Sequence, residues 1–120
     1  MEDAAIGSDV IRGYIDLIIL RALHDGDSYG YEISKKITGI SGNLYSMKET
    51  TLYSAFSRLE KLNYLRSYAG SYSGGRERIY YALTDAGRQH YRKKCDEWKL
   101  TKALVAKFIM DEEEDSNGRC

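Results

Sequence analysis

The sequence predicts a mainly α-helical fold with one small β-hairpin, and three observations support this prediction. Apolar residues recur at helical spacing in residues 9–24, 52–62 and 91–109. Between the last two stretches, two aromatic-rich runs flank Gly74-Gly75, a pair that suits a tight turn. The 120 residues are enough for one small domain with a single core.

Residues 9–24 are expected to form the first helix, with Ser8 or Asp9 as its N-cap. This helix is apolar around much of its circumference, and Ile11, Tyr14 and Ile18 are among its apolar residues. A helix that is apolar on several sides needs more than one burial partner. We therefore expect it to contact both the domain core and a second subunit.

A second helix is expected from a cap at Ser28 to about Thr38, after the break at residues 25–27. Its spacing directs Tyr29, Ile33 and Ile37 towards the core.

The next helix carries two contrasting faces. Its core face is predicted to hold Leu52, Ala55, Phe56, Leu59 and Leu62. The opposite face is rich in Ser and Thr, which are poor helix formers, whereas a solvated helix face is usually rich in Glu and Lys. Either this face simply tolerates small polar residues, or it enters a DNA groove. Its members are Thr50, Ser54, Ser57, Arg58 and Lys61, with Thr51 and Tyr53 on its flanks.

The hairpin is predicted from residues 65–73 and 76–83. In its second strand Ile79 and Leu83 are expected to face the core. Arg76 and Arg78 lie close to the tip, where basic side chains suit the DNA backbone or a minor groove. Thr84 is then expected to cap the last helix.

The last helix, about residues 85–110, is long for so small a domain. Apolar residues along it would be exposed on an isolated chain, and a two-fold partner would cover them. Trp98 has two interpretations, as an aromatic residue of the dimer core or as one wall of a pocket for a flat hydrophobic ligand. The seam and its widened flank consist of Tyr91, Cys95, Trp98, Val105 and Ile109, with Leu100, Leu104 and Phe108.

Formal net charge is zero, but its distribution is uneven. Residues 1–47 carry −3, residues 48–107 carry +7, and residues 108–120 carry −4. Positive charge therefore concentrates on the proposed DNA-binding helix, the hairpin and the last helix, as expected of a DNA-binding surface. The lysines of the last helix can equally serve only to solvate it.

Other classes of function lack support in the sequence. No apolar run is long enough to span a membrane, and no catalytic constellation or metal-ligand spacing is present. We therefore expect no enzyme, no cofactor, no metal and no membrane association. The two cysteines, Cys95 and Cys120, fit a reducing cytoplasm.

Three segments, SYGYEISKKI, ETTLYSAFSRLEKLNYL and GGRERIYYALTDAGRQ, together resemble the PadR family of winged helix-turn-helix transcriptional regulators. The resemblance implies a winged helix-turn-helix domain over residues 1–84, a dimerisation helix over 85–110 and an acidic, disordered tail over 111–120. It also implies a homodimer that binds an inverted-repeat operator, usually as a repressor. Tyr29, Tyr31 and Tyr53 match the family's motifs, whereas Thr50 and Ser54 depart from them. The shortness of the chain after the hairpin resembles the family's smaller branch.

These inferences predict a sequence-specific regulator that binds double-stranded DNA. The exposed helix face, with Tyr29 and Tyr31 nearby, is expected at the major groove, and Lys48, Lys61, Arg76 and Arg78 at phosphates or a minor groove. A small planar hydrophobic effector is expected, if present, at Tyr14 and Trp98. The dimer interface is expected to include Ile11, Tyr14, Ile18, Tyr91, Cys95, Trp98, Val105, Phe108 and Ile109. The alternative is a winged-helix protein-interaction module that binds no DNA.

Overall fold

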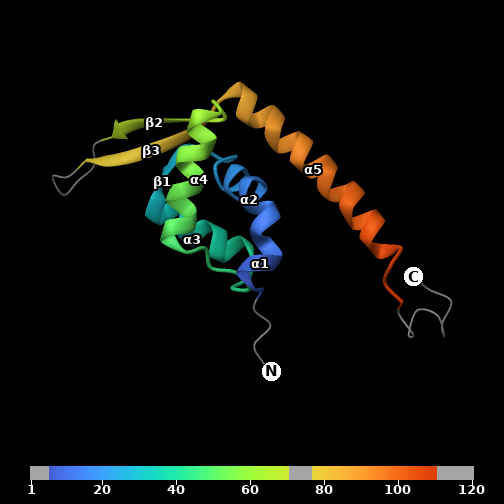
Figure 1. The fold of residues 1–120 in the computed structure, drawn as a ribbon. Helices are drawn as coiled ribbons and strands as arrows, with labels where there is room; N and C mark the ends of the chain where they lie inside the picture. The colour runs from blue at the N-terminus through green and yellow to red at the C-terminus, as the bar shows by residue number, and fades with distance from the viewer. Residues whose placement is uncertain (1–5, 71–76, 111–120) are drawn as a thin grey trace.

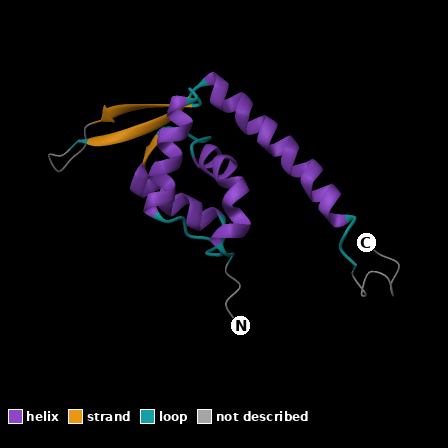
Figure 2. Cartoon of the chain, in the orientation of Figure 1, coloured by secondary structure: helices purple, strands orange, loops and turns teal. Residues whose placement is uncertain are grey.

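The computed structural model describes residues 6–70 and 77–110, and Figure 1 shows how their elements are arranged. Helices dominate, with one small antiparallel sheet (Figure 2), which confirms the predicted fold class. Gly74-Gly75, Arg76 and the acidic tail lie outside the described residues. The elements are α1 (Ser8–Ile11), η1 (Arg12–Tyr14), α2 (Ile15–Ala22), β1 (Ser28–Tyr29), α3 (Gly30–Ile40), α4 (Glu49–Lys61), β2 (Leu65–Gly70), β3 (Arg78–Leu83) and α5 (Asp85–Ala106).

The first predicted helix is not one regular α-helix. A 3₁₀ turn, η1, separates α1 from α2, and it contains Gly13. Glycine costs helix stability because it loses more backbone freedom than other residues, and a tighter 3₁₀ turn commonly takes up such a break. Tyr14 is the N-cap of α2, and its backbone, at φ −116° and ψ 9°, is not α-helical. The regular α-helix resumes at Ile15.

The prediction that Ser28 caps the second helix is wrong. Ser28 and Tyr29 form the short strand β1, and α3 begins at Gly30 with no side-chain cap. The buried Ser28 hydroxyl donates a hydrogen bond to the Glu32 carboxylate instead. Tyr29 is only half-buried, because it lies at the sheet edge rather than on the inner face of a helix.

The sheet has three antiparallel strands in the order β1-β3-β2, one more than the predicted hairpin. Strand β3 pairs with β2 from Leu65↔Leu83 to Gly70↔Arg78, and with β1 through Ser28↔Tyr81 and Tyr29↔Tyr80. We call the paired strands β2 and β3 the wing. A two-residue strand carries too little periodicity to be recognised in a sequence.

The core lies among α2, α3, α4 and the base of the wing, and includes Ile19, Leu20, Leu23, Ile33, Leu52, Phe56, Leu59 and Leu65. Two residues expected there lie outside it. Ile79 is 49% exposed because the wing extends beyond the core, and Leu62 is 53% exposed because it follows the last turn of α4.

Helix α5 begins with the predicted cap. The Thr84 hydroxyl accepts a hydrogen bond from the Gly87 backbone N–H at 2.9 Å and donates one to the Asn63 carbonyl at 2.7 Å. The helix packs against α2 and then extends away from the domain (Figure 1). It ends at Ala106 rather than Met110, so Phe108, Ile109 and Met110 follow the helix.

Candidate nucleic-acid interface

Helix α4 presents a polar face to solvent, which we call the reading face. Leu52, Ala55, Phe56 and Leu59 are buried, as their spacing predicted. At 100° per residue, Thr50, Ser54, Ser57 and Lys61 share the side opposite the core, and all four are exposed. Lys48 precedes the helix as its N-cap. The described surface therefore contains a row of short hydroxyl side chains that ends in a lysine.

The two flanks of the reading face border different elements. Thr51 and Arg58 lie on the flank next to η1 and α2, where they line a hollow with Arg12 and Ile15. Tyr53 lies on the opposite flank, next to α3 and β3. Figure 1 shows the same arrangement, with α4 between the wing and the α1–α2 segment. A duplex groove that receives α4 would thus have a protein element beside each of its walls.

On the wing flank, residues distant in the sequence come together. Tyr29, Gly30, Tyr31, Tyr53 and Arg78 line a hollow of about 480 Å³ with Ile79 and Tyr81. The Arg78 guanidinium lies 4.2 Å from the centre of the Tyr29 ring, and this ring meets Tyr80 edge-on at 5.6 Å. The structure thus brings the three tyrosines that were predicted to bind DNA next to a basic residue of the wing.

Tyr53 is held by close packing. Its ring meets Phe56 edge-on at 5.4 Å, and its hydroxyl lies against Gly30. A Cβ on residue 30 would lie 2.1 Å from the hydroxyl oxygen, so only glycine leaves room for the ring in this position. Gly30 therefore fixes the orientation of a predicted DNA-binding side chain, although the sequence pattern did not single it out.

Arg58 does not point freely into solvent. Its guanidinium donates to the Asp16 carboxylate of α2, and the other Asp16 oxygen lies 3.7 Å from His90 Nε2 of α5. The His90 ring stacks on Tyr64 with centroids 4.0 Å apart. Three helices thus meet at Asp16, and 42 residues separate it from Arg58, so no local motif indicates the pair.

The outer part of the wing is supported by its own aromatic contacts. Tyr68 stacks over Tyr80 with centroids 5.7 Å apart, and its hydroxyl donates to the Asp27 carboxylate at 2.7 Å. That hydrogen bond raises the pKa of Tyr68, because ionisation would remove the donated proton. These contacts tie β2 to the segment before β1 and orient the strand that carries Arg78.

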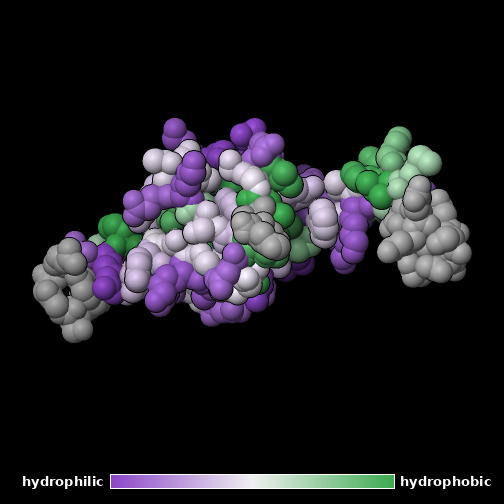
Figure 3. Space-filling model, turned by 90° about the horizontal axis from the view of Figure 1, so that it is seen from below, coloured by the Kyte–Doolittle hydropathy of each residue, from purple (hydrophilic) through white to green (hydrophobic). Residues whose placement is uncertain are grey.

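The predicted dimer and effector residues lie on the α1–α2 segment, on α5 and just after α5. Tyr14 meets Trp98 edge-on at 5.4 Å, and both line a hollow of about 320 Å³ with Val10 and Leu17. Ile11, Ile18, Tyr91 and Cys95 are half-buried, and Tyr91 packs on the core. Towards the end of α5 the apolar side chains are exposed, and Figure 3 shows them as a green patch at the far right: Leu104, Val105, Phe108, Ile109 and Met110.

None of the helices in ranges 6–70 and 77–110 is long and apolar enough to cross a membrane. Within the same ranges, no group of three or more His, Cys, Asp or Glu side chains is placed to hold a metal ion.

Comparison with known proteins identifies the family. Residues 19–93 match the transcriptional regulator PadR-like family. A transcriptional regulator from Clostridium thermocellum shares 55% identity and a TM-score of 0.80 over 88% of this chain and 100% of its own. A PadR family transcription regulator from Clostridium difficile shares 36% identity and a TM-score of 0.70, over 82% and 100% of the two chains.

An uncharacterized protein of Lysinibacillus sphaericus is 40% identical over 104 residues, which are 87% of this chain and 95% of that protein. The residues that match the family, 19–93, run from the second half of α2 to the first part of α5, and they include the whole reading face, β1 and both described wing strands. The chain is therefore a member of the PadR-like family of transcriptional regulators, with a winged-helix fold followed by a C-terminal helix.

Proposed function

We propose that this protein regulates transcription by binding double-stranded DNA in a sequence-specific manner, with α4 in the major groove. The observation that carries the proposal is the reading face, with its exposed hydroxyl side chains between two flanking elements. Short polar side chains let a helix approach base edges closely, and the flanking cations suit the phosphates on either side. Family membership supports the same function.

Residues divide into two roles in this proposal. Those at the groove or its rims are Thr50, Thr51, Tyr53, Ser54, Ser57 and Arg58, with Tyr29 and Tyr31 beside Tyr53. Those at phosphates or a flanking minor groove are Lys48, Lys61, Arg76 and Arg78. The close packing of Tyr29, Tyr31, Tyr53 and Arg78 around one hollow supports a shared role for these four.

We also propose a homodimer that acts as a repressor on an inverted repeat. The exposed apolar side chains of α5 and the residues after it suit burial against a second copy. Two-fold symmetry then presents two reading helices to one side of the duplex, with half-sites about one helical turn apart. The hollow beside Tyr14 and Trp98 is the proposed effector site, for a small planar hydrophobic compound.

Selection of bound fragments from a random DNA pool tests the central proposal. We expect an inverted repeat to be enriched, with an affinity that falls steeply as salt rises, because bound Lys and Arg release counterions. Enrichment of no sequence, or binding that ignores salt, would favour the alternative of a protein-interaction module.

Two variants then separate base recognition from phosphate contact. Ser54→Ala is expected to change which sequence is enriched, because a base-contacting hydroxyl is lost. Arg76→Ala with Arg78→Ala is expected to weaken binding to every sequence about equally and to flatten the salt dependence. If the wing variant alters only the preference for AT-rich flanks, the wing contacts the minor groove rather than phosphates.

A further inference from the structure

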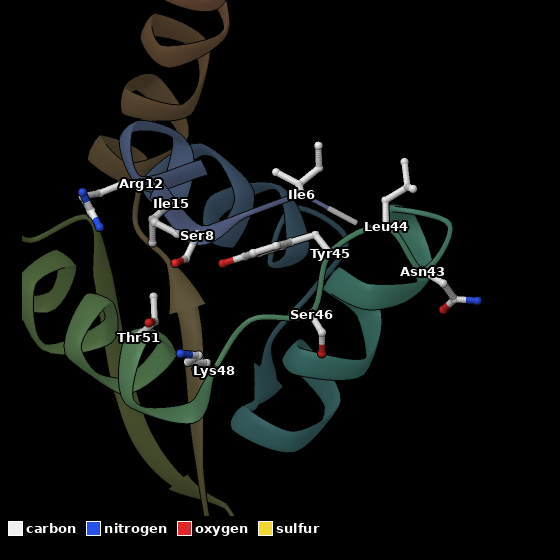
Figure 4. A pocket seen from close by; sticks show the side chains of 10 residues that line it. All are labelled: Ile6, Ser8, Arg12, Ile15, Asn43, Leu44, Tyr45, Ser46, Lys48 and Thr51. Carbon is white, nitrogen blue, oxygen red and sulfur yellow. The ribbon is translucent and has the colours of Figure 1, made fainter. Parts of the chain in front are cut away.

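A cationic pocket lies beside the first turn of α4. It has a volume of about 480 Å³ and is lined by residues of the α1–η1 segment, the loop before α4 and α4 itself. Figure 4 shows Ser8, Arg12, Tyr45, Lys48 and Thr51 around one end of it, with Asn43 and Leu44 at the other. Three parts of the chain thus contribute polar groups to one cavity.

The chemistry of the lining suits an anion. Arg12 and Lys48 supply two positive charges, and none of the described residues that line the pocket carries a carboxylate. Within the described ranges, neither Arg12 nor Lys48 forms an ion pair. Hydroxyl groups come from Ser8, Tyr45 and Thr51, and Ser46 adds a fourth to the lining. A tyrosine hydroxyl is protonated at neutral pH, and burial raises the pKa of Tyr45 further above its usual value, so this hydroxyl is available as a donor.

The pocket is continuous with the reading face. A second hollow, of about 510 Å³, is lined by Arg12, Ile15 and Thr51 together with Thr50, Ser54 and Arg58. Arg12, Ile15 and Thr51 therefore belong to both hollows. A duplex seated on the reading face would bring its backbone to the mouth of the cationic pocket.

The pocket lies on the flank of α4 that faces away from the wing. Thr51 borders it, whereas Tyr53, on the other flank, faces Arg78. A helix in the major groove, which is about 12 Å wide, has a phosphate backbone on each side. The wing can therefore contact one phosphate backbone, and the flank of α4 next to Arg12 can contact the other.

We propose that Arg12 and Lys48, with the surrounding hydroxyl groups, bind a backbone phosphate of the DNA strand opposite the wing. This inference rests on the proposed DNA-binding function and adds Arg12, which no sequence pattern indicates, to the residues that contact DNA. Guanidinium and ammonium groups bind phosphate oxygens through charge-assisted hydrogen bonds, so the contact anchors the protein without reading a base.

Titration of the enriched DNA fragment over a series of salt concentrations tests the proposal. Arg12→Gln is expected to weaken binding of the proposed dimer about three- to tenfold. It should reduce the slope of log K against log salt by about 0.9, which is half of the loss expected when both subunits give up their phosphate contact, because Lys48 still holds that phosphate. The double variant Arg12→Gln with Lys48→Gln is expected to reduce the slope by about 1.8, because each of the two subunits then loses one phosphate contact worth about 0.9. Arg12→Lys should restore most of the slope, and the preferred sequence should stay the same in every variant.

Arg92→Gln is the matched control. Arg92 is exposed on α5, and its substitution removes the same charge at a site away from the pocket. If wild-type protein binds DNA and Arg12→Gln has the same salt slope as Arg92→Gln, the phosphate assignment is wrong while the DNA-binding function stands. If wild-type protein binds no DNA, both proposals fail. Circular dichroism checks that each variant is folded.

A second experiment tests whether the pocket binds a phosphate of the DNA backbone or a free phosphate ion. Inorganic phosphate is titrated at constant ionic strength while thermal unfolding is followed. We expect added phosphate to change the melting temperature of wild type and of Arg12→Gln equally. The pocket should hold a phosphodiester only while contacts elsewhere hold the rest of the duplex, so it should bind free phosphate poorly. Stabilisation of wild type alone, without a change in the DNA salt slope of Arg12→Gln, would assign the pocket to a free phosphate and overturn the proposal.

Discussion

The Arg58 guanidinium, on one flank of the reading face of α4, is paired with the Asp16 carboxylate of α2. The pair is partly exposed, with 48% of the Arg58 side chain and 20% of the Asp16 side chain accessible. Arg58 is thus oriented by a neighbouring helix before any DNA is present. The same carboxylate places a negative charge beside a surface that is proposed to meet phosphates.

We predict that Asp16→Asn strengthens DNA binding several-fold. The substitution keeps the size of the side chain but removes the charge that neutralises Arg58, so Arg58 can engage a phosphate or a base fully. Because a partly exposed ion pair contributes about 1 kcal/mol or less, the domain should lose little stability. Asp96→Asn, exposed on α5, removes the same charge as a control. Equal dissociation constants for the two variants would show that Asp16 does not compete with DNA.

The contact between Gly30 and Tyr53 leads to a second prediction. Gly30→Ala is expected to push the Tyr53 ring towards solvent and to weaken operator binding, with little loss of stability because the displaced ring is already 46% exposed. Gly39→Ala on the same helix is the control, since a Cβ there meets nothing within 4 Å. In a Tyr53→Ala background, Gly30→Ala should have no further effect on binding. An undiminished effect would mean that Gly30 acts through another contact.

The third prediction concerns assembly. Val105→Glu with Ile109→Glu is expected to convert the dimer to a monomer, because each substitution places an unpaired charge in the proposed apolar interface. Sedimentation velocity measures the change, and operator affinity should fall because a monomer loses the tethering of its second half-site. Gln89→Glu, on an exposed polar part of α5, should leave the dimer intact. A dimer that survives both glutamates would place the main interface elsewhere, most simply at Ile11 and Ile18.

Trp98 provides a fourth prediction, because it is the only tryptophan of the chain and lies 5.4 Å from Tyr14. Planar hydrophobic compounds that enter the adjacent hollow are expected to quench its fluorescence and to weaken operator binding. Trp98→Ala should reduce that change in DNA affinity. Quenching with no change in DNA affinity would show that the cavity binds compounds without any regulatory effect. If no such compound quenches the fluorescence, Trp98 serves only in packing.

The fifth prediction is a loss of stability at high pH. Burial raises the pKa of Tyr81, whose ring stacks on Phe56 with centroids 4.0 Å apart. Above about pH 10 this tyrosine ionises more readily in the unfolded chain than in the folded one, so the free energy of unfolding falls, by at most about 1.4 kcal/mol per pH unit for one group. Urea unfolding between pH 8 and 11 measures the fall. Tyr81→Phe keeps the stacking and should make the fall shallower. An identical pH dependence would exclude Tyr81 as a contributor.

Local periodicity was enough to predict much of this fold. The burial of Leu52, Phe56 and Leu59 follows from helical spacing, and the Thr84 cap follows from a hydroxyl residue placed just before a helix. The reading face was predicted in the same way, because composition and spacing within one helix determine which side chains share a side. These features depend on residues a few positions apart, so the chain itself contains the information.

Tertiary packing decided the rest. Ser28 became a strand residue because β3 offered it a pairing edge, and Ile79 remained exposed because the wing extends beyond the core. Arg58 meets Asp16, and Arg12 lines the same pocket as Lys48, only because the α1–α2 segment lies along one flank of α4. Spacing within a helix fixes the direction of a side chain about that helix's own axis. It does not fix where another helix crosses it, so the surroundings of Arg58 and Arg12 depend on how the whole core packs.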